Sequence, residues 1–396
     1  MTAPALATTT TRVVVAAALP WGLVAALVAM RVTTPAAAQE PATSAGFFAS
    51  AAAVPASKAA PAWQVTVRSD HHSDALPLAV LGDDDWQHLA PRPGRNLAYL
   101  DDEVRLHRRS GDWTWGLLAR SQASVVASRE TLQLARAVDA GKRPATDTHW
   151  SADMRMRAFS GVGLLVARSQ VLAPGWTGGV SAQALALGGW RSRSISGPVA
   201  YDAARRSYSF ALQSHEVNNR LDYPYQQAFA RRGAGLLLGA ELAWTAGDWS
   251  ASAALRDGGW LHWRGVPQQQ ASLATDRQGV DADGFLVYGP LIEGRNRQDG
   301  LTQRQPWRGQ LALSRHWGRG QQLGVSLDTV PDFGVLPAVQ WQRPVGEALL
   351  GLGWRLHERR LTVALDWRGF SLRAGADRLD AAARSRALAL GYGMAF

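Results

Sequence analysis

From Trp63 to the last residue, large apolar side chains recur at every second position in segments of about ten residues. In WTWGLLAR (113–120), one face carries Trp113, Trp115, Leu117 and Ala119, and the other carries Thr114, Gly116, Leu118 and Arg120. The segments MRMRAFSGVGLLV (154–166), LLLGAELAW (236–244) and PWRGQLALSRHW (306–317) alternate in the same way. A period of two places alternate side chains on opposite faces of a β-strand. The pattern therefore predicts strands with one apolar face.

The alternation predicts fourteen strands, with 206–217 treated as an extension of a loop. They are 62–69, 97–109, 112–126, 148–168, 176–195, 231–246, 248–264, 304–317, 321–330, 333–342, 346–357, 361–367, 370–379 and 386–396. Twelve or sixteen strands also fit, because strand ends are the least defined part of such a pattern. Pro337 has no N–H for a strand ladder, so we expect a bulge or weak pairing there.

The links between these strands are of two kinds. Short glycine-centred links occur at 110–112, 246–248 and 318–320, and long polar links occur near 127–147, 196–230 and 265–303. The first long link has the composition of a short helix. Short turns at one end and long loops at the other are typical of a barrel that spans an outer membrane.

A soluble β-sandwich would show the same alternation, because it also buries one face of each sheet. The tryptophans distinguish the two architectures. They gather at strand ends beside the links, at 113, 115, 244, 249, 307, 317, 341, 354 and 367, where a membrane barrel carries its aromatic girdles. We therefore expect an all-β fold, a transmembrane antiparallel β-barrel.

The N-terminus has the features of an export signal. Val13–Met30 is almost wholly apolar, and Ala36–Ala38 offers a small-residue processing site. A retained membrane anchor is the alternative, since eighteen apolar residues can span a bilayer. We predict a cleaved signal peptide over 1–38, an Ala/Pro-rich linker over 39–61 and a barrel over 62–396, located in the outer membrane.

Composition narrows the chemistry further. The absence of cysteine excludes disulfides, thiolate catalysis and cysteine zinc sites. The formal net charge of +10 comes mostly from scattered arginines, and no dense basic block points to nucleic acid. Glycine-rich phosphate loops are also missing from the sequence. We expect neither nucleic-acid binding nor a cofactor.

The last nine residues, LALGYGMAF, place Leu390, Tyr392, Met394 and Phe396 at alternating positions. This ending resembles the C-terminal signature of Gram-negative outer-membrane β-barrels. The resemblance implies that the last strand closes the barrel against the first and that the barrel assembly machinery reads it. Outer-membrane lipid and lipopolysaccharide would then be further partners.

A second resemblance concerns 233–244 (GAGLLLGAELAW) and 248–263 (DWSASAALRDGGWLHW). Together with fourteen strands behind an N-terminal segment, they are similar to the long-chain fatty-acid transporter type of barrel and to related uncharacterised barrels. The Asn-Pro-Ala motif of that family does not occur between residues 39 and 95. Its substrates are therefore not carried over to this chain.

If the apolar faces contact lipid, the opposite faces line the lumen. The residues predicted to line the pore are Arg105, Arg120, Arg155, Arg157, Glu241, Arg256, Arg308, Asp328, Arg355, Asp366 and Arg373. An arginine surplus in a low-dielectric pore favours anionic solutes. The alternative is that arginines and acids pair across a packed lumen.

Three polar clusters invite sharper hypotheses. Residues 70–74 (DHHSD) contain metal-ligand types, but neighbours on a strand face opposite ways, so we expect a solvated loop and no metal. Ser214-His215-Glu216 with Asn218 has the side chains of a serine hydrolase, although a triplet cannot itself fold into a triad. The acidic run 83–85 near His88 is similar to the Asp and His pairs of outer-membrane proteases.

These features favour a non-enzymatic function, a passive channel or transporter for small anionic or amphipathic solutes. The alternative is a structural barrel whose long loops bind a partner. An outer-membrane hydrolase is the third hypothesis.

Overall fold

The computed structural model describes residues 62–81, 88–230, 232–275, 278–280, 286–288, 291–318 and 320–395. The predicted signal peptide, the linker, the acidic run 83–85 and Phe396 lie outside these residues. Among the helices that are described, none is both long and apolar enough to cross a membrane.

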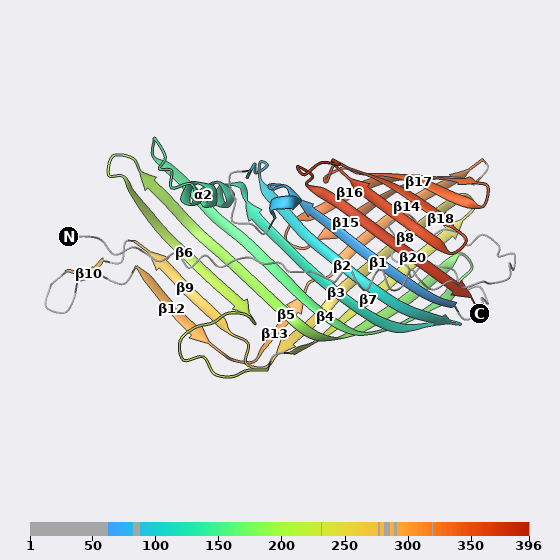
Figure 1. Cartoon of the computed structure of the whole chain (residues 1–396), viewed down its shortest axis with the longest axis horizontal. Coiled ribbons are helices and arrows are strands. Elements are labelled where there is room, and N and C mark those ends of the chain that lie inside the picture. The colour runs from blue at the N-terminus through green and yellow to red at the C-terminus, as the bar shows by residue number, and fades with distance from the viewer. Residues whose placement is uncertain are drawn as a thin grey trace.

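Fourteen antiparallel strands form a closed barrel, as the sequence predicted (Figure 1). They are β1 (Ala62–Ser73), β2 (Arg95–Ser110), β3 (Trp113–Ser128), β4 (Thr148–Ala173), β5 (Trp176–Asp202), β7 (Gly233–Ala246), β8 (Trp249–Trp263), β14 (Arg308–Trp317), β15 (Gln321–Val330), β16 (Gly334–Val345), β17 (Ala348–Arg355), β18 (Arg360–Trp367), β19 (Phe370–Ala376) and β20 (Ser385–Ala395). Strand β1 pairs with β2 on one side and with β20 on the other, which closes the barrel. Because every strand has two neighbours, no edge is left at the level of the barrel wall.

The wall is much taller on one side than on the other. Strands β4 and β5 contain 26 and 27 residues, whereas β17, β18 and β19 contain 8, 8 and 7. The first half of β5 pairs with β7 in the barrel, and its second half pairs with β6 (Ser207–Asn218) beyond it. Strands β9 (Gln268–Ala274) and β12 (Ile292–Arg297) continue this sheet, which projects from the long-loop end (Figure 1).

Smaller elements complete the long-loop end. Strand β13 (Leu301–Gln305) pairs with the second half of β8, and β10 (Gln278–Val280) pairs with β11 (Leu286–Tyr288). The 3-10 turn η1 spans Leu78–Val80. The helix predicted in the first long link is α2 (Arg129–Asp139), which Ser128 caps by accepting a hydrogen bond from the Thr131 N–H.

Side chains alternate between the outer and inner faces of the wall. On β3, Leu117 is 58% exposed and its neighbour Leu118 is 4% exposed. The exposed apolar band is bounded by tryptophans, as expected for a surface in contact with lipid. Toward the short-turn end these are Trp113, Trp115, Trp249, Trp317 and Trp367, and toward the long-loop end they are Trp260, Trp307 and Trp354.

The inner face is filled with side chains on its tall side. A buried apolar cluster joins β3, β4, β5, β7 and β8. Its most deeply buried members, each at most 1% exposed, are Leu187, Val217, Leu237, Leu261, Trp263 and Val266. The Trp263 indole N–H also donates to the Ala230 carbonyl oxygen at 2.6 Å. Transmembrane barrels usually have a polar interior, so this apolar patch narrows the space available to water.

Two local expectations meet the structure differently. Of the bulge or weak pairing expected at Pro337, the bulge is absent, because β15 and β16 pair in continuous register through Leu327 and Pro337. The pairing of β16 with β17 begins one residue later, at Ala338, so Pro337 is paired in a strand ladder on one side only. The second expectation was wrong. The polar segment 70–74 was expected to be a solvated loop, but β1 extends to Ser73, and His72 and Asp74 are fully buried.

Candidate functional site

Ion pairs link opposite walls of the barrel. Asp101 on β2 accepts hydrogen bonds from Arg68 on β1 at 2.5 Å and from Arg308 on β14 at 3.0 Å. Strands β2 and β14 are not neighbours in the barrel, so the second contact crosses the lumen. The Asp101 side chain is only 7% exposed, and such a buried carboxylate needs paired cations.

Asp257 on β8 forms the matching half of this arrangement. Its two oxygens accept from both Arg120 Nη atoms, at 2.7 and 3.1 Å, in the bidentate geometry that arginine favours with carboxylates. Arg308 lies 3.9 Å away and so links Asp257 to Asp101. We refer to Arg68, Asp101, Arg120, Asp257 and Arg308 as the ionic belt.

A β-bulge brings Asp257 into the lumen. The register between β7 and β8 shifts between Leu238 and Ala240, so two residues of β8 lie opposite one residue of β7. Asp257 has a positive φ of 63°, a conformation that aspartate and asparagine tolerate better than most residues. Strict alternation from Leu255 would have turned Asp257 toward lipid, and the bulge reverses that parity.

A second charged group lies nearer the long-loop end. Arg355 donates to Asp328 at 2.6 Å and to Glu358 at 3.0 Å. Arg360 donates to both oxygens of Asp70, at 2.6 and 3.2 Å. Arg360 and Glu358 are 2% and 1% exposed, so this group is as buried as the ionic belt.

The other residues predicted to line the pore also have polar neighbours. Arg105 pairs with Glu103 at 2.7 Å, and Arg373 pairs with Asp366 at 3.5 Å. Four more positions complete the set. Arg256 donates to Gln310 at 3.4 Å, Arg155 and Arg157 both reach Asp332 in the turn between β15 and β16, and Glu241 lies beside Gly179 on β5.

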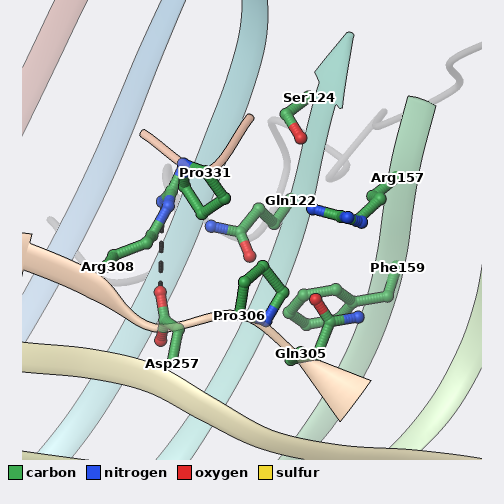
Figure 2. A pocket seen from close by; sticks show the side chains of 9 residues that line it. All are labelled: Gln122, Ser124, Arg157, Phe159, Asp257, Gln305, Pro306, Arg308 and Pro331. Atoms are coloured by element: carbon green, nitrogen blue, oxygen red, sulfur yellow. Dashed lines mark ion pairs between the residues drawn. The ribbon is translucent and has the colours of Figure 1, made fainter. Parts of the chain in front are cut away.

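A small recess, partly open to solvent, lies next to the ionic belt (Figure 2). Strands β3 and β4 contribute polar side chains and one aromatic ring to its wall, and the turn between β15 and β16 contributes a proline. Its lining residues are Gln122, Ser124, Arg157, Phe159, Asp257, Gln305, Pro306, Arg308 and Pro331. Polar and apolar side chains therefore meet in one inner space.

Sequence reasoning missed several of these partners. Asp101 has the same strand parity as Arg105, so alternation was sufficient to find it. Asp257 could be assigned to the lumen only if the bulge was predicted, and the Asp-Gly-Gly run at 257–259 is the local signal for that bulge. Arg68 and Asp70 were assigned to a strand and a polar loop, without a role in the lumen.

The hydrolase hypothesis gains no support from the geometry. Ser214, His215 and Glu216 follow one another on β6, so the histidine side chain points away from the other two. Glu216 lies 3.3 Å from Arg191 and 3.5 Å from Arg193, and Asn218 donates to it at 3.3 Å. The carboxylate is thus held by arginines of the neighbouring strand β5.

The closed wall, the exposed apolar band, the tryptophan girdles and the charged interior define a transmembrane β-barrel of the outer-membrane class. The final strand packs as that class requires. Tyr392 on β20 is 47% exposed on the outer face, and β20 pairs with both β1 and β19.

No protein-family model matches the sequence, and no curated protein matches it. Solved structures with a similar fold include the toluene transporter TodX of Pseudomonas putida, at 8% identity over 85% of this chain and 90% of that chain, with a TM-score of 0.37. The toluene transporter TbuX of Ralstonia pickettii matches at 6% identity over 85% and 90%, with a TM-score of 0.31. A FadL homologue of Pseudomonas aeruginosa matches at 7% identity over 84% and 89%, with a TM-score of 0.27. These values are too low to assign a substrate to this chain.

Proposed function

We propose that this protein is a passive transporter of the outer membrane for small amphipathic anions, which bind in the inner recess on their way through the barrel. The observation that carries the proposal is the mixed lining of that recess. The guanidinium groups of Arg308 and Arg157 lie on opposite sides of it, and Phe159, Pro306 and Pro331 supply apolar contact (Figure 2).

The charge around the recess supports an anionic solute. In the ionic belt, the guanidinium groups of Arg68, Arg120 and Arg308 form ion pairs with the two carboxylates of Asp101 and Asp257. Arg155 and Arg157 share the carboxylate of Asp332. Within these ion pairs the guanidinium groups outnumber the carboxylates, and low-dielectric walls strengthen the attraction of such charges for an anion.

The test compares uptake of benzenesulfonate by proteoliposomes that contain the wild-type barrel, Arg157→Gln or Arg155→Gln. Both arginines pair with Asp332, but only Arg157 lines the recess. A hydrogen bond to a charged group contributes about 1.5–3 kcal/mol, so Arg157→Gln should lower uptake at limiting concentration by about tenfold. Arg155→Gln should lower uptake much less than Arg157→Gln, because Arg155 contributes to the charge of the same group but does not line the recess.

The proposal fails if wild-type proteoliposomes take up benzenesulfonate no faster than protein-free vesicles. It also fails if both arginine variants reduce uptake equally, because the effect would then come from the loop that Asp332 anchors. Methanesulfonate, which lacks the ring, tests the apolar side. It should bind more weakly than benzenesulfonate if Phe159 contacts the solute.

The projecting sheet of β5, β6, β9 and β12 favours a second candidate, a barrel whose long-loop end binds a partner. Leu291 and Ile292 at the start of β12 are 52% and 58% exposed. Deleting 268–297 would remove β9 and β12 and keep β13 on β8. If this candidate is correct, the shortened barrel still assembles and takes up solute, and a cell loses only the phenotype that depends on the partner.

A further inference from the structure

Two histidines and an aspartate converge at the long-loop end, where the end of β1 meets the turn between β17 and β18. The His72 Nε2 atom lies 3.0 Å from Asp74 Oδ1, and the His357 Nε2 atom also lies 3.0 Å from Asp74 Oδ1. His72 and Asp74 have fully buried side chains, and that of His357 is 21% exposed. This cluster is separate from the ionic belt and from the recess.

The three side chains offer ligand atoms at the spacing of a metal site. All of these atoms lie within 4.8 Å of one another. Tetrahedral zinc with bonds of about 2.0–2.1 Å to nitrogen holds its ligand atoms roughly 3.4 Å apart. Small shifts of the two rings would therefore bring all three atoms to bonding distance of one ion. Three protein ligands leave the fourth position for water.

The surrounding contacts hold the donors in place. The Leu97 N–H donates to Asp74 Oδ2 at 2.8 Å, which fixes the carboxylate plane. The His72 ring lies 5.6 Å from the Tyr99 ring, and the His357 ring lies 5.0 Å from the Phe333 ring. Burial alone would raise the pKa of Asp74, but hydrogen bonds from His357, His72 and the Leu97 N–H outweigh it and hold that pKa well below its usual range.

Two arginines already contact Asp74: Arg384 Nη1 donates to its carbonyl oxygen at 3.0 Å, and Arg92 reaches its carboxylate. The Arg92 Nη1 atom lies 2.6 Å from Asp74 Oδ1 and 3.1 Å from the His357 carbonyl oxygen. A metal ion on Asp74 and this guanidinium would repel each other at such a distance. The Arg92 side chain is 29% exposed, so it has a path into solvent when an ion enters.

We propose that His72, Asp74 and His357 bind one zinc ion, which displaces Arg92 and joins the end of β1 to the turn between β17 and β18. Imidazole donors select zinc and its transition-metal neighbours over magnesium and calcium, which prefer oxygen ligands. The ion would tie together two segments that lie far apart in the chain. It would thereby stabilise the wall beside the lumen without forming part of the solute site.

The experiment uses the full barrel without a histidine tag, in detergent, stripped with a chelator and dialysed against zinc. Bound zinc per chain is measured by mass spectrometry, and affinity is measured by competition with a chelating dye. Wild type should hold one zinc ion. Arg92→Gln should bind about tenfold more tightly or better, because a competing charge is removed.

His357→Ala should weaken zinc binding by more than about a hundredfold, since even outer partners of a metal site are worth 10–100-fold. His71→Ala is the matched control. The His71 Nε2 atom bonds to Asp102 at 2.9 Å and to Ser69 at 3.2 Å, away from the cluster. This variant should bind zinc like wild type. Partly exposed His357 also allows His357→Gln as a second variant if the alanine variant fails to fold.

A second readout is thermal unfolding. Zinc should raise the Tm of wild type and of His71→Ala, because an ion that binds only the folded state stabilises it. It should not change the Tm of His357→Ala. The proposal is overturned if neither wild type nor Arg92→Gln retains zinc, or if His357→Ala retains as much zinc as wild type.

Discussion

The substitution Asp257→Asn tests whether the ionic belt stabilises the barrel. Asparagine suits the positive φ at this position, so the backbone of the bulge is kept and only the charge is lost. At position 257 Arg120 then meets a neutral amide oxygen in place of a bidentate carboxylate at 2.7 and 3.1 Å, and its hydrogen bond to Gln183 at 3.0 Å is kept. The change isolates the electrostatic part of the contact.

The expected loss follows from burial. The side chains of Arg120 and Asp257 are 3% and 14% exposed, so solvent screens them little. Removing one partner of a buried pair typically costs 3–5 kcal/mol, and the amide oxygen of asparagine recovers part of it. We expect the free energy of unfolding to fall by about 3 kcal/mol. The variant Arg120→Met should cost a similar amount.

The double variant Arg120→Met/Asp257→Asn completes the cycle. Because the two residues are in contact, its loss should be smaller than the sum of the single losses by about 2 kcal/mol. The measurement is urea unfolding in detergent micelles followed by tryptophan fluorescence. Glu347→Gln is the matched control, since Glu347 and Arg368 are also 2.6 Å apart but 64% and 65% exposed. This surface pair should contribute nothing measurable.

The reasoning is refuted if Asp257→Asn changes the free energy of unfolding by less than about 1 kcal/mol, or if the single losses simply add. Conductance in planar bilayers gives an independent result. A lumen crossed by Arg308 and Asp101 should conduct little, and releasing Arg120 and Arg308 from Asp257 should increase the current.

Three further predictions concern the wall. Leu311 is 55% exposed on the outer face between Trp307 and Trp317, so Leu311→Arg should cost about 2–4 kcal/mol in lipid vesicles; a neutral result would mean that this face does not contact lipid. Gly163→Ala would place a methyl group against the Ala184 carbonyl oxygen, whereas Gly188→Ala meets nothing within 4 Å. We expect only the former to lower the free energy of unfolding, by about 1–3 kcal/mol. Deleting Phe396, the predicted assembly signal, should reduce the amount of folded barrel in outer-membrane fractions, and unchanged amounts would contradict that role.

The wall of this barrel was predictable from the sequence because lipid imposes a strict rule on it. Each outward position must be apolar. Alternating apolar residues such as Leu311 and its neighbours therefore show where a strand lies, which of its faces contacts lipid and where it ends. Glycine turns such as the one at Gly111, with a φ of 58°, mark the reversals. Such signals are local and are repeated in every hairpin.

The interior was less predictable, because its contacts join strands that are distant in sequence. Alternation placed Arg308 inward but did not indicate that Asp101 lies opposite it. At Asp257 a single extra residue reversed the parity. The cluster of His72 and Asp74 depended on His357, which no spacing rule connects to it. Charges that looked like a basic lining are therefore largely balanced by acids from other strands.

The pairing of β1 with β20 has a consequence for biogenesis. Ala62 lies opposite Ala395, so β1 meets its second neighbour only when nearly the whole chain is available. Until then β1 and the last strand already in place each present an unpaired backbone edge, which invites pairing with other chains. Contacts of such long sequence separation also form slowly. A chain that stops before β20 would remain an open sheet with two exposed edges. This topology therefore requires both edges to be protected until the barrel closes.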